Sequence, residues 1–170
     1  MARRWVFLVV LAAGCDVAGS QQGYEPAQPL AFSHALHAGE YQIDCLYCHS
    51  GAERSRHAGI PAVSTCMNCH AEVKKDAPDI QRLAAAVAEG KPLSWVKVHR
   101  FPDFAYFSHA SHLVAGGQTC QTCHGPVETM VRVRQVATMT MGWCLGCHRR
   151  APRASGGKLA PPMDCVACHR

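Results

Sequence analysis

Apolar residues follow a helical period over only a short part of the chain. Between residues 79 and 89 they recur every three or four positions, which predicts one amphipathic helix. Pro78 suits the first turn of this helix, and Gly90 suits its end. The apolar stripe consists of Ile80, Leu83, Ala84 and Val87. Elsewhere the pattern predicts turns and short helices, so we expect a mainly α-helical protein with much irregular coil.

The apolar run at the N-terminus is too short to span a bilayer. Residues 1–15 combine two arginines with an apolar stretch and small residues, and they end at Cys15, which is typical of an exported lipoprotein. We therefore expect a signal peptide cleaved before Cys15 and a lipid on Cys15 that anchors the protein at the periplasmic face of the inner membrane. An ordinary secretory peptide is the alternative. Residues 16–31, rich in Gly, Gln, Pro and Ala, predict a flexible tether.

The pattern Cys-x-x-Cys-His occurs five times in 170 residues. It is typical of a c-type haem attachment site, in which two thiols bond covalently to one haem and the histidine binds the iron from the proximal side. A random chain of this composition would contain roughly 0.05 such matches. Zinc ribbons, redox dithiols and disulfide frameworks give no reason for a histidine at the fifth position each time. We therefore predict five covalently bound haem c groups.

These five motifs use ten of the eleven cysteines in the chain. The predicted attachment cysteines are Cys45, Cys48, Cys66, Cys69, Cys120, Cys123, Cys144, Cys147, Cys165 and Cys168. The predicted proximal iron ligands are His49, His70, His124, His148 and His169. Cys15 is the cysteine left over, and an odd cysteine in an exported protein calls for an explanation such as lipidation.

A second element, Phe-x-His-x-x-His, precedes the first and the third motif. Its copies begin at Phe32 and Phe107, and the same offset of 75 residues relates their histidines and the motifs that follow. Each copy is then followed by a further motif. We therefore expect two di-haem modules, at residues 32–106 and 107–150, and a fifth haem in residues 151–170.

Six histidines lie outside the motifs, and five irons need at most five distal ligands. Two histidines three positions apart lie on one side of a helical turn and point in somewhat different directions, so that each can reach a different haem. The predicted distal ligands are His34, His37, His99, His109 and His112. His57, in a basic loop, is an alternative to His99. Methionine sulfur is a competing ligand, available from Met130, Met139, Met141 and Met163.

The composition limits both the core and the partners. Aromatic residues make up 7% of the chain, which is too few to build a large hydrophobic core. Haem faces would therefore supply much of the core. The chain without haem should be largely unfolded. The formal charge is +5, but haem propionates would add roughly two negative charges per haem. No basic run with interleaved aromatic residues occurs, so we expect no nucleic-acid binding.

The Phe-x-His-x-x-His element followed by Cys-x-x-Cys-His resembles class III multihaem cytochromes c, small proteins whose irons are bound by two histidines. Residues 31–150 are also similar to the pentahaem cytochrome c subunits of alternative complex III, a bacterial quinol:cytochrome c oxidoreductase. The similar phrases are DCLYCHSGAERSRHAGIPAVSTCMNCH, PLSWVKVHRFPDFAYFSHASH and MTMGWCLGCHR. This resemblance implies that the predicted proximal histidines match the family's Cys-x-x-Cys-His motifs and that the predicted distal histidines match the family's remaining histidines.

This resemblance implies a subunit that lies beside an iron–sulfur, molybdopterin-like subunit and a quinol-oxidising membrane subunit. It would pass electrons to a soluble or subunit cytochrome c or to a terminal oxidase. A transmembrane helix would be expected in that family, whereas here a lipid on Cys15 is predicted. A cytochrome subunit of another molybdopterin or iron–sulfur membrane oxidoreductase is therefore the alternative.

The motifs themselves favour electron transfer, in which each iron cycles between two oxidation states and no substrate bond is made. We expect the protein to act as an electron-transfer subunit rather than as a catalyst on its own. A multihaem reductase would need one five-coordinate iron and a substrate pocket, and the sequence has no Cys-x-x-Cys-Lys variant. An electron shuttle tethered only by lipid is a third hypothesis.

Overall fold

The computed structural model describes residues 20–169, so the predicted signal peptide and Cys15 lie outside the described residues. Within that range the chain forms helices and irregular coil without strands, as the sequence predicts. The one feature with strand-like pairing in that part is an isolated antiparallel bridge between Ala105 and His169. No helix between residues 20 and 169 combines the length and the hydropathy that crossing a bilayer requires.

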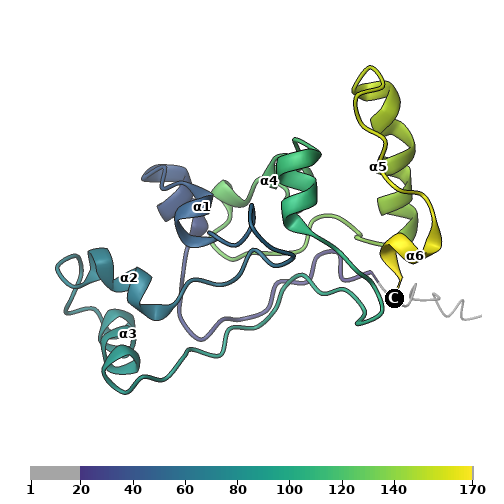
Figure 1. Ribbon diagram of the computed structural model, residues 1–170. Helices are drawn as coiled ribbons and strands as arrows, with labels where there is room; N and C mark the ends of the chain where they lie inside the picture. Colours follow the sequence, from purple (N-terminus) through teal and green to yellow (C-terminus); the bar gives the residue numbers. More distant parts are fainter. Residues whose placement is uncertain (1–19, 170) are drawn as a thin grey trace, which may run out of the picture.

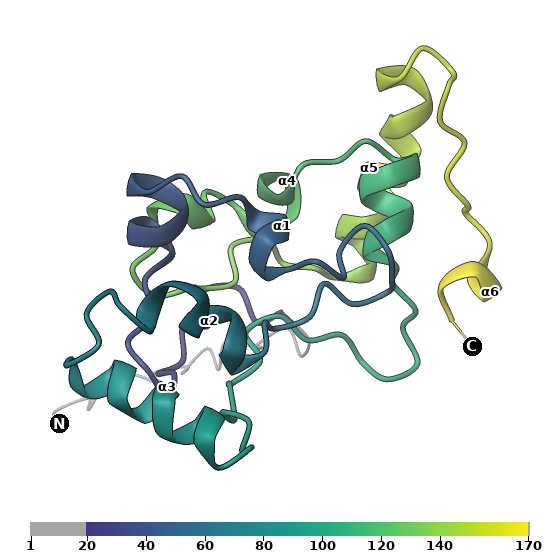
Figure 2. The same cartoon turned by 60° about the vertical axis from the view of Figure 1, so that its left-hand side comes forward.

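Five α-helices each carry one Cys-x-x-Cys-His motif or its cysteines. They are α1 (Cys45–Cys48), α2 (Val63–His70), α4 (Cys120–His124), α5 (Met141–Ala154) and α6 (Cys165–Cys168). The remaining helical elements are α3 (Pro78–Ala88), the wide π-helical turns η1 (Ala35–Glu40) and η2 (Ser111–Ala115), and the short turn η3 (Val127–Thr129). Helices α2 and α3 lie at one end of the molecule, and α5 and α6 lie at the other (Figures 1 and 2).

The amphipathic helix predicted for residues 79–89 is confirmed as α3, with Pro78 in its first turn. Its apolar stripe is only partly covered, because Leu83 is 5% exposed whereas Val87 is 43% exposed. Helix α3 packs against α2, and the two lie side by side in Figure 2. The stripe therefore serves as local core for the end of the molecule that carries the second motif.

The segment expected to be a flexible tether is fixed to the rest of the chain from residue 23 onwards. Gly23 N–H donates to the Gln135 carbonyl at 2.7 Å, and Gln135 N–H donates to the Tyr24 carbonyl at 3.0 Å. The Gln28 amide side chain both donates to and accepts from the backbone of Val96. Apart from the side-chain amide of Gln28, these bonds use backbone groups, which every residue carries, so a composition rich in Gly, Gln and Pro gave no sign of them.

The stretch that follows the fourth motif, residues 149–164, begins as helix. Helix α5 continues from the fourth motif through to Ala154, and its last residues include Pro152. A proline removes one backbone donor and usually interrupts a helix. Here Pro152 lies in the last turn, so little helix follows it, and the Ser155 N–H still donates to the Ala151 carbonyl at 3.0 Å.

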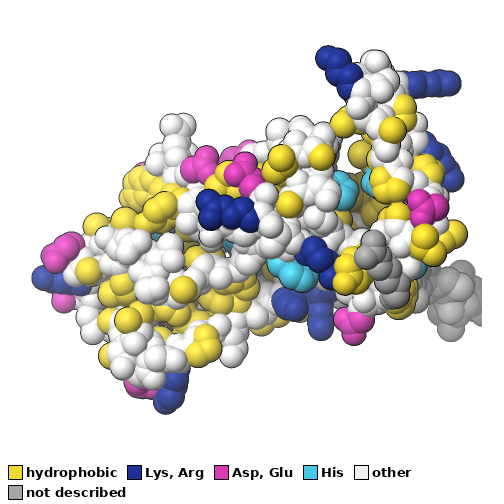
Figure 3. Space-filling model, in the orientation of Figure 1, with side chains coloured by type: hydrophobic (Ala, Val, Ile, Leu, Met, Phe, Trp, Pro, Cys, Tyr) yellow, Lys and Arg dark blue, Asp and Glu magenta, His cyan; other side chains and the backbone are white. Residues whose placement is uncertain are grey.

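The polypeptide by itself has a very small core. The buried apolar side chains among the described residues are Leu30, Ala52, Leu83 and Met130. Many large apolar side chains are exposed instead, and hydrophobic atoms spread over much of the face seen in Figure 3. Few buried side chains and many exposed ones are expected of a chain that packs around large apolar groups rather than around itself.

Candidate cofactor sites

Each pair of motif cysteines lies within one helical turn, so both thiols lie on the same side of a short helix. Helices of four residues are marginal on their own, and side-chain caps help to start them. The Asp44 carboxylate accepts from Leu46 N–H at 2.7 Å at the start of α1, and the Asp164 carboxylate accepts from Ala167 N–H at 2.9 Å at the start of α6. No disulfide joins any two of the ten motif cysteines.

Two of the predicted distal histidines face the proximal histidine of the motif that follows them. The rings of His34 and His49 have centroids 6.4 Å apart and planes 5° apart. The rings of His109 and His124, which occupy the same positions in the second copy of the repeat, have centroids 6.3 Å apart and planes 3° apart. Both copies therefore build the same nearly parallel pair of imidazoles.

The second histidine of each copy faces a different motif. His37 lies opposite His70 with ring centroids 6.1 Å apart, and His112 lies opposite His148 with centroids 6.0 Å apart. One π-helical turn therefore supplies a partner to two motifs at once, which is the division of roles that the sequence predicts for Phe-x-His-x-x-His.

The spacing of these four pairs fits one six-coordinate iron between the rings of each. An imidazole nitrogen binds a transition-metal ion at about 2 Å, and the ring centroid lies about 1.1 Å behind that nitrogen, so two rings on opposite sides of one ion have centroids about 6.2 Å apart. The observed range is 6.0–6.4 Å. Between residues 20 and 169 no group of three or more His, Cys, Asp or Glu side chains converges as a protein-only metal site would require.

Backbone carbonyls fix the orientation of six of these imidazoles. The Nδ1 atoms lie 2.7–2.9 Å from carbonyl oxygens in the pairs His49–Gly59, His70–Val73, His148–Pro162, His37–Ser33, His112–Ser108 and His109–Arg56. A carbonyl can only accept, so each Nδ1 carries the proton and each Nε2 keeps its lone pair for a metal. Such bonds also hold the ring plane and strengthen the ligand. His34 Nδ1 is buried without a partner among the described residues.

Two of the imidazoles are held in the neutral form that binds metal. Burial lowers the pKa of His34 to about 4, with smaller contributions from His49 and His37. Burial likewise lowers the pKa of His124 to about 4, and His99 is the next largest cause. Both rings are therefore uncharged at neutral pH.

His99 lies beside His124 rather than opposite the fifth proximal histidine. The two rings meet edge to face with centroids 4.4 Å apart, and His99 Nε2 lies 3.3 Å from His124 Nδ1. His99 therefore occupies the acceptor position that a backbone carbonyl fills for most of the other imidazoles. The turn after the motif is sharp here, because Gly125 has φ 72° and ψ −166°, a conformation essentially restricted to glycine.

The fifth motif differs from the other four in its surroundings. The ring in contact with His169 is that of Phe104, with centroids 5.8 Å apart, and no histidine ring among the described residues contacts it. His57, which the sequence offers as an alternative to His99, is exposed. Of the candidate methionines, Met130 is buried in the small core, whereas Met141 and Met163 are exposed.

The sequence did not point to the carbonyls that orient the rings. Gly59 and Pro162 lie 10 and 14 residues beyond the histidines they bind. Their carbonyl groups are present in every residue type, so no side-chain signal could have marked them.

Comparisons with known proteins point to one group. Residues 15–101 match the family model described as the class III cytochrome C family, and residues 105–170 match the model described as cytochrome c7 and related cytochrome c. The chain is also similar to the multihaem cytochrome c subunit of menaquinone reductase from Nitratidesulfovibrio vulgaris. The two are 29% identical over 163 residues, covering 84% of this chain and 77% of that protein. The two matched stretches meet close to the second Phe-x-His-x-x-His copy.

Proposed function

Since this chain is a member of the class III cytochrome c family, whose haems are covalently bound, we propose that it is a five-haem electron-transfer subunit of a quinone-linked membrane oxidoreductase. The observation that carries the proposal is the set of four proximal–distal imidazole pairs, each spaced for one iron. When bound, the haem irons would supply reversible one-electron chemistry between the ferric and ferrous states.

Different residues of this chain would hold different parts of each haem. The cysteine pairs of the five motifs would fix each porphyrin edge to a helix. The proximal histidines would bind iron from one side, and four of the predicted distal histidines would bind it from the other. At these four motifs, ligands on both sides would leave no open position for a small molecule, which suits electron transfer.

The partners follow from the resemblance and the relative. Similarity to alternative complex III cytochromes supports electron flow from quinol, through an iron–sulfur and a quinol-oxidising membrane subunit, towards a cytochrome c or oxidase. The relative is named for menaquinone reduction, which supports flow in the opposite direction within a complex of similar type. We place the protein at the periplasmic face of the inner membrane, held there by a lipid on Cys15.

Purified mature protein from an exporting host tests this proposal. We expect five haems per chain by mass and by pyridine haemochrome absorbance, and carbon monoxide binding by at most the one haem of the fifth motif. In the complex isolated through a tag on this chain, menaquinol should reduce the haems or menaquinone should oxidise them. The faster of the two reactions gives the direction of electron flow. Zinc in the thiol pairs, fewer than five haems, or no exchange with either quinone form would overturn the proposal.

His99 is assigned a positioning role, with its Nε2 accepting the Nδ1–H of His124. Such a bond makes the bound imidazole a stronger donor and lowers the potential of its iron. His99→Ala should therefore leave the four haems with paired imidazoles low-spin and raise one midpoint potential by about 40 mV, since a bond worth about 1 kcal/mol converts to that shift in a one-electron couple. His99→Gln, which keeps an acceptor, should restore most of the shift. A new high-spin haem in His99→Ala would instead identify His99 as a sixth ligand.

A further inference from the structure

We infer that the five attachment motifs form one row in space in the order second, first, third, fourth, fifth, because the two repeat modules meet head to head. The inference rests on the proposed function in so far as each motif holds a haem. Four contacts between neighbouring motifs support the order.

The first and second motifs are joined by His34, the N-cap residue of η1, and His37 within η1, because each faces the proximal histidine of a different motif. The motif helices also touch directly, since Asn68 Nδ2 donates to the Tyr47 hydroxyl at 3.0 Å. The second motif therefore lies beside the first.

The third and fourth motifs are joined in the same way by η2. Gln118, just before the third motif, and Cys147 of the fourth line one cavity of about 250 Å³. Each module therefore keeps its two motifs together through its own π-helical turn.

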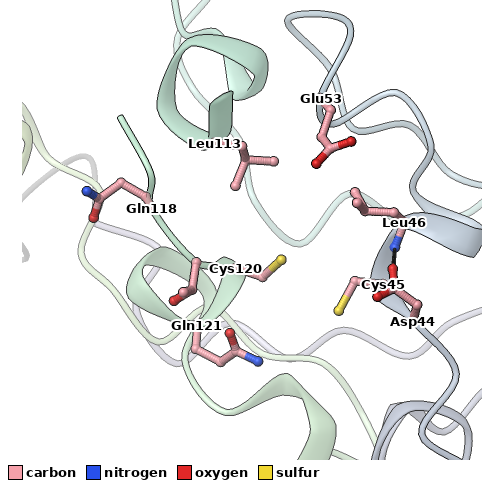
Figure 4. Close-up of a pocket in the computed structure, with 9 residues that line it drawn as sticks. Asp44, Cys45, Leu46, Glu53, Leu113, Gln118, Cys120 and Gln121 are labelled. Atoms are coloured by element: carbon pink, nitrogen blue, oxygen red, sulfur yellow. Dashed lines mark hydrogen bonds between the residues drawn. The ribbon is translucent and has the colours of Figure 1, made fainter. Parts of the chain in front are cut away.

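The two modules meet through their first motifs. Cys45 and Cys120 line one cavity of about 240 Å³, and their sulfur atoms point towards each other across it (Figure 4). These two cysteines are 75 residues apart, which is the offset of the repeat. The same offset relates the flanking residues that line the cavity, namely Asp44 with Thr119 and Leu46 with Gln121. Equivalent residues facing one another are the mark of a two-fold, isologous contact, here within one chain.

The fifth motif extends the row beyond the fourth. His148 Nδ1 donates to the carbonyl of Pro162, close before the fifth motif, at 2.9 Å. Burial raises the pKa of the Cys144 thiol, and Cys168 is the next largest cause. In both views the motif helices follow one another across the molecule in the order α2, α1, α4, α5, α6 (Figures 1 and 2).

The order in space differs from the order along the chain in the positions of the first and second motifs. If the modules met head to tail, the second motif would lie beside the third and the first would be at an end. The head-to-head junction puts the first motif in the interior and makes the second and the fifth the two ends of the row.

Electron paramagnetic resonance of two matched variants of the oxidised holoprotein tests the order. Cys45→Ser with Cys48→Ser removes the first haem, which should leave the second without a neighbour. Its signal should then be narrow, uncoupled and equal to about one of the four haems left. Cys66→Ser with Cys69→Ser removes the second haem at the end of the row, so no isolated signal should appear. Chain order predicts the reverse result, which would overturn the inference.

Crystals of the unaltered holoprotein give the same answer if either variant fails to mature. Anomalous scattering at the iron absorption edge locates the five irons, and the first should lie between the second and the third. A second iron placed between the first and the third would refute the head-to-head junction. Five irons in another order would leave the proposed function intact, whereas a chain with fewer haems would refute that function itself.

Discussion

His112→Ala should convert one haem iron of the five into a high-spin, five-coordinate centre that binds carbon monoxide. His112 is the imidazole opposite His148, with ring centroids 6.0 Å apart, so its removal takes away one axial ligand and leaves the thiol attachment intact. A carbon monoxide difference spectrum of the reduced protein should show about one site per chain more than the unaltered protein does. The change is large because an iron either has its sixth ligand or lacks it.

Ser111→Ala is the matched control, since Ser111 precedes His112 on the same π-helical turn. Its hydroxyl bonds to the Ser108 hydroxyl at 3.0 Å in an exposed position, and its loss should leave the spectrum unchanged. His37→Ala, the equivalent change in the first module, should again expose about one site. If His112→Ala bound no more carbon monoxide than the unaltered protein, another group of the chain would have to be the ligand opposite His148.

The chain prepared without haem should have no cooperative fold. Its accessible surface is 12702 Å², whereas a compact monomer of 18.4 kDa exposes about 8200 Å². Helices α1 and α6 contain four residues each, far below the length at which an isolated helix is stable in water. Protein made in a cytoplasm without haem attachment should therefore show a coil-like far-ultraviolet dichroism spectrum and rapid proteolysis.

The exported holoprotein, treated in parallel, is the control and should resist the same protease. A sharp thermal transition in the haem-free chain, at a temperature close to that of the holoprotein, would contradict this expectation. It would mean that Leu83, Met130 and the few other buried apolar side chains suffice as a core.

Local features of this protein could be predicted from the sequence because they depend on residues close together in the chain. The period of apolar residues located α3 almost to the residue. The spacing within Phe-x-His-x-x-His indicated that its two histidines serve different motifs, and the structure brings His34 and His37 opposite His49 and His70. In both cases a helical turn alone decides which side chains lie together.

Features that depend on distant contacts could not be predicted in this way. The sequence has the same repeat offset whether the modules meet head to head or head to tail, so the junction of Cys45 with Cys120 left no trace in it. The position of His99 beside His124 depends on how an extended segment returns to the third motif. The continuation of α5 beyond the fourth motif ran against the composition of that stretch, where Pro152 indicated an earlier end.

The carbonyl bonds of His49 and His148 make loop length a determinant of the magnetic properties of the protein. Gly59 and Pro162 reach back to hold these rings from the far side of an intervening loop. Shortening either loop by one residue would swivel an imidazole about its bond to iron while every motif residue stayed in place. The anisotropy of a low-spin ferric haem depends on the angle between its two axial ring planes, so these loops, and not the motifs, would set it.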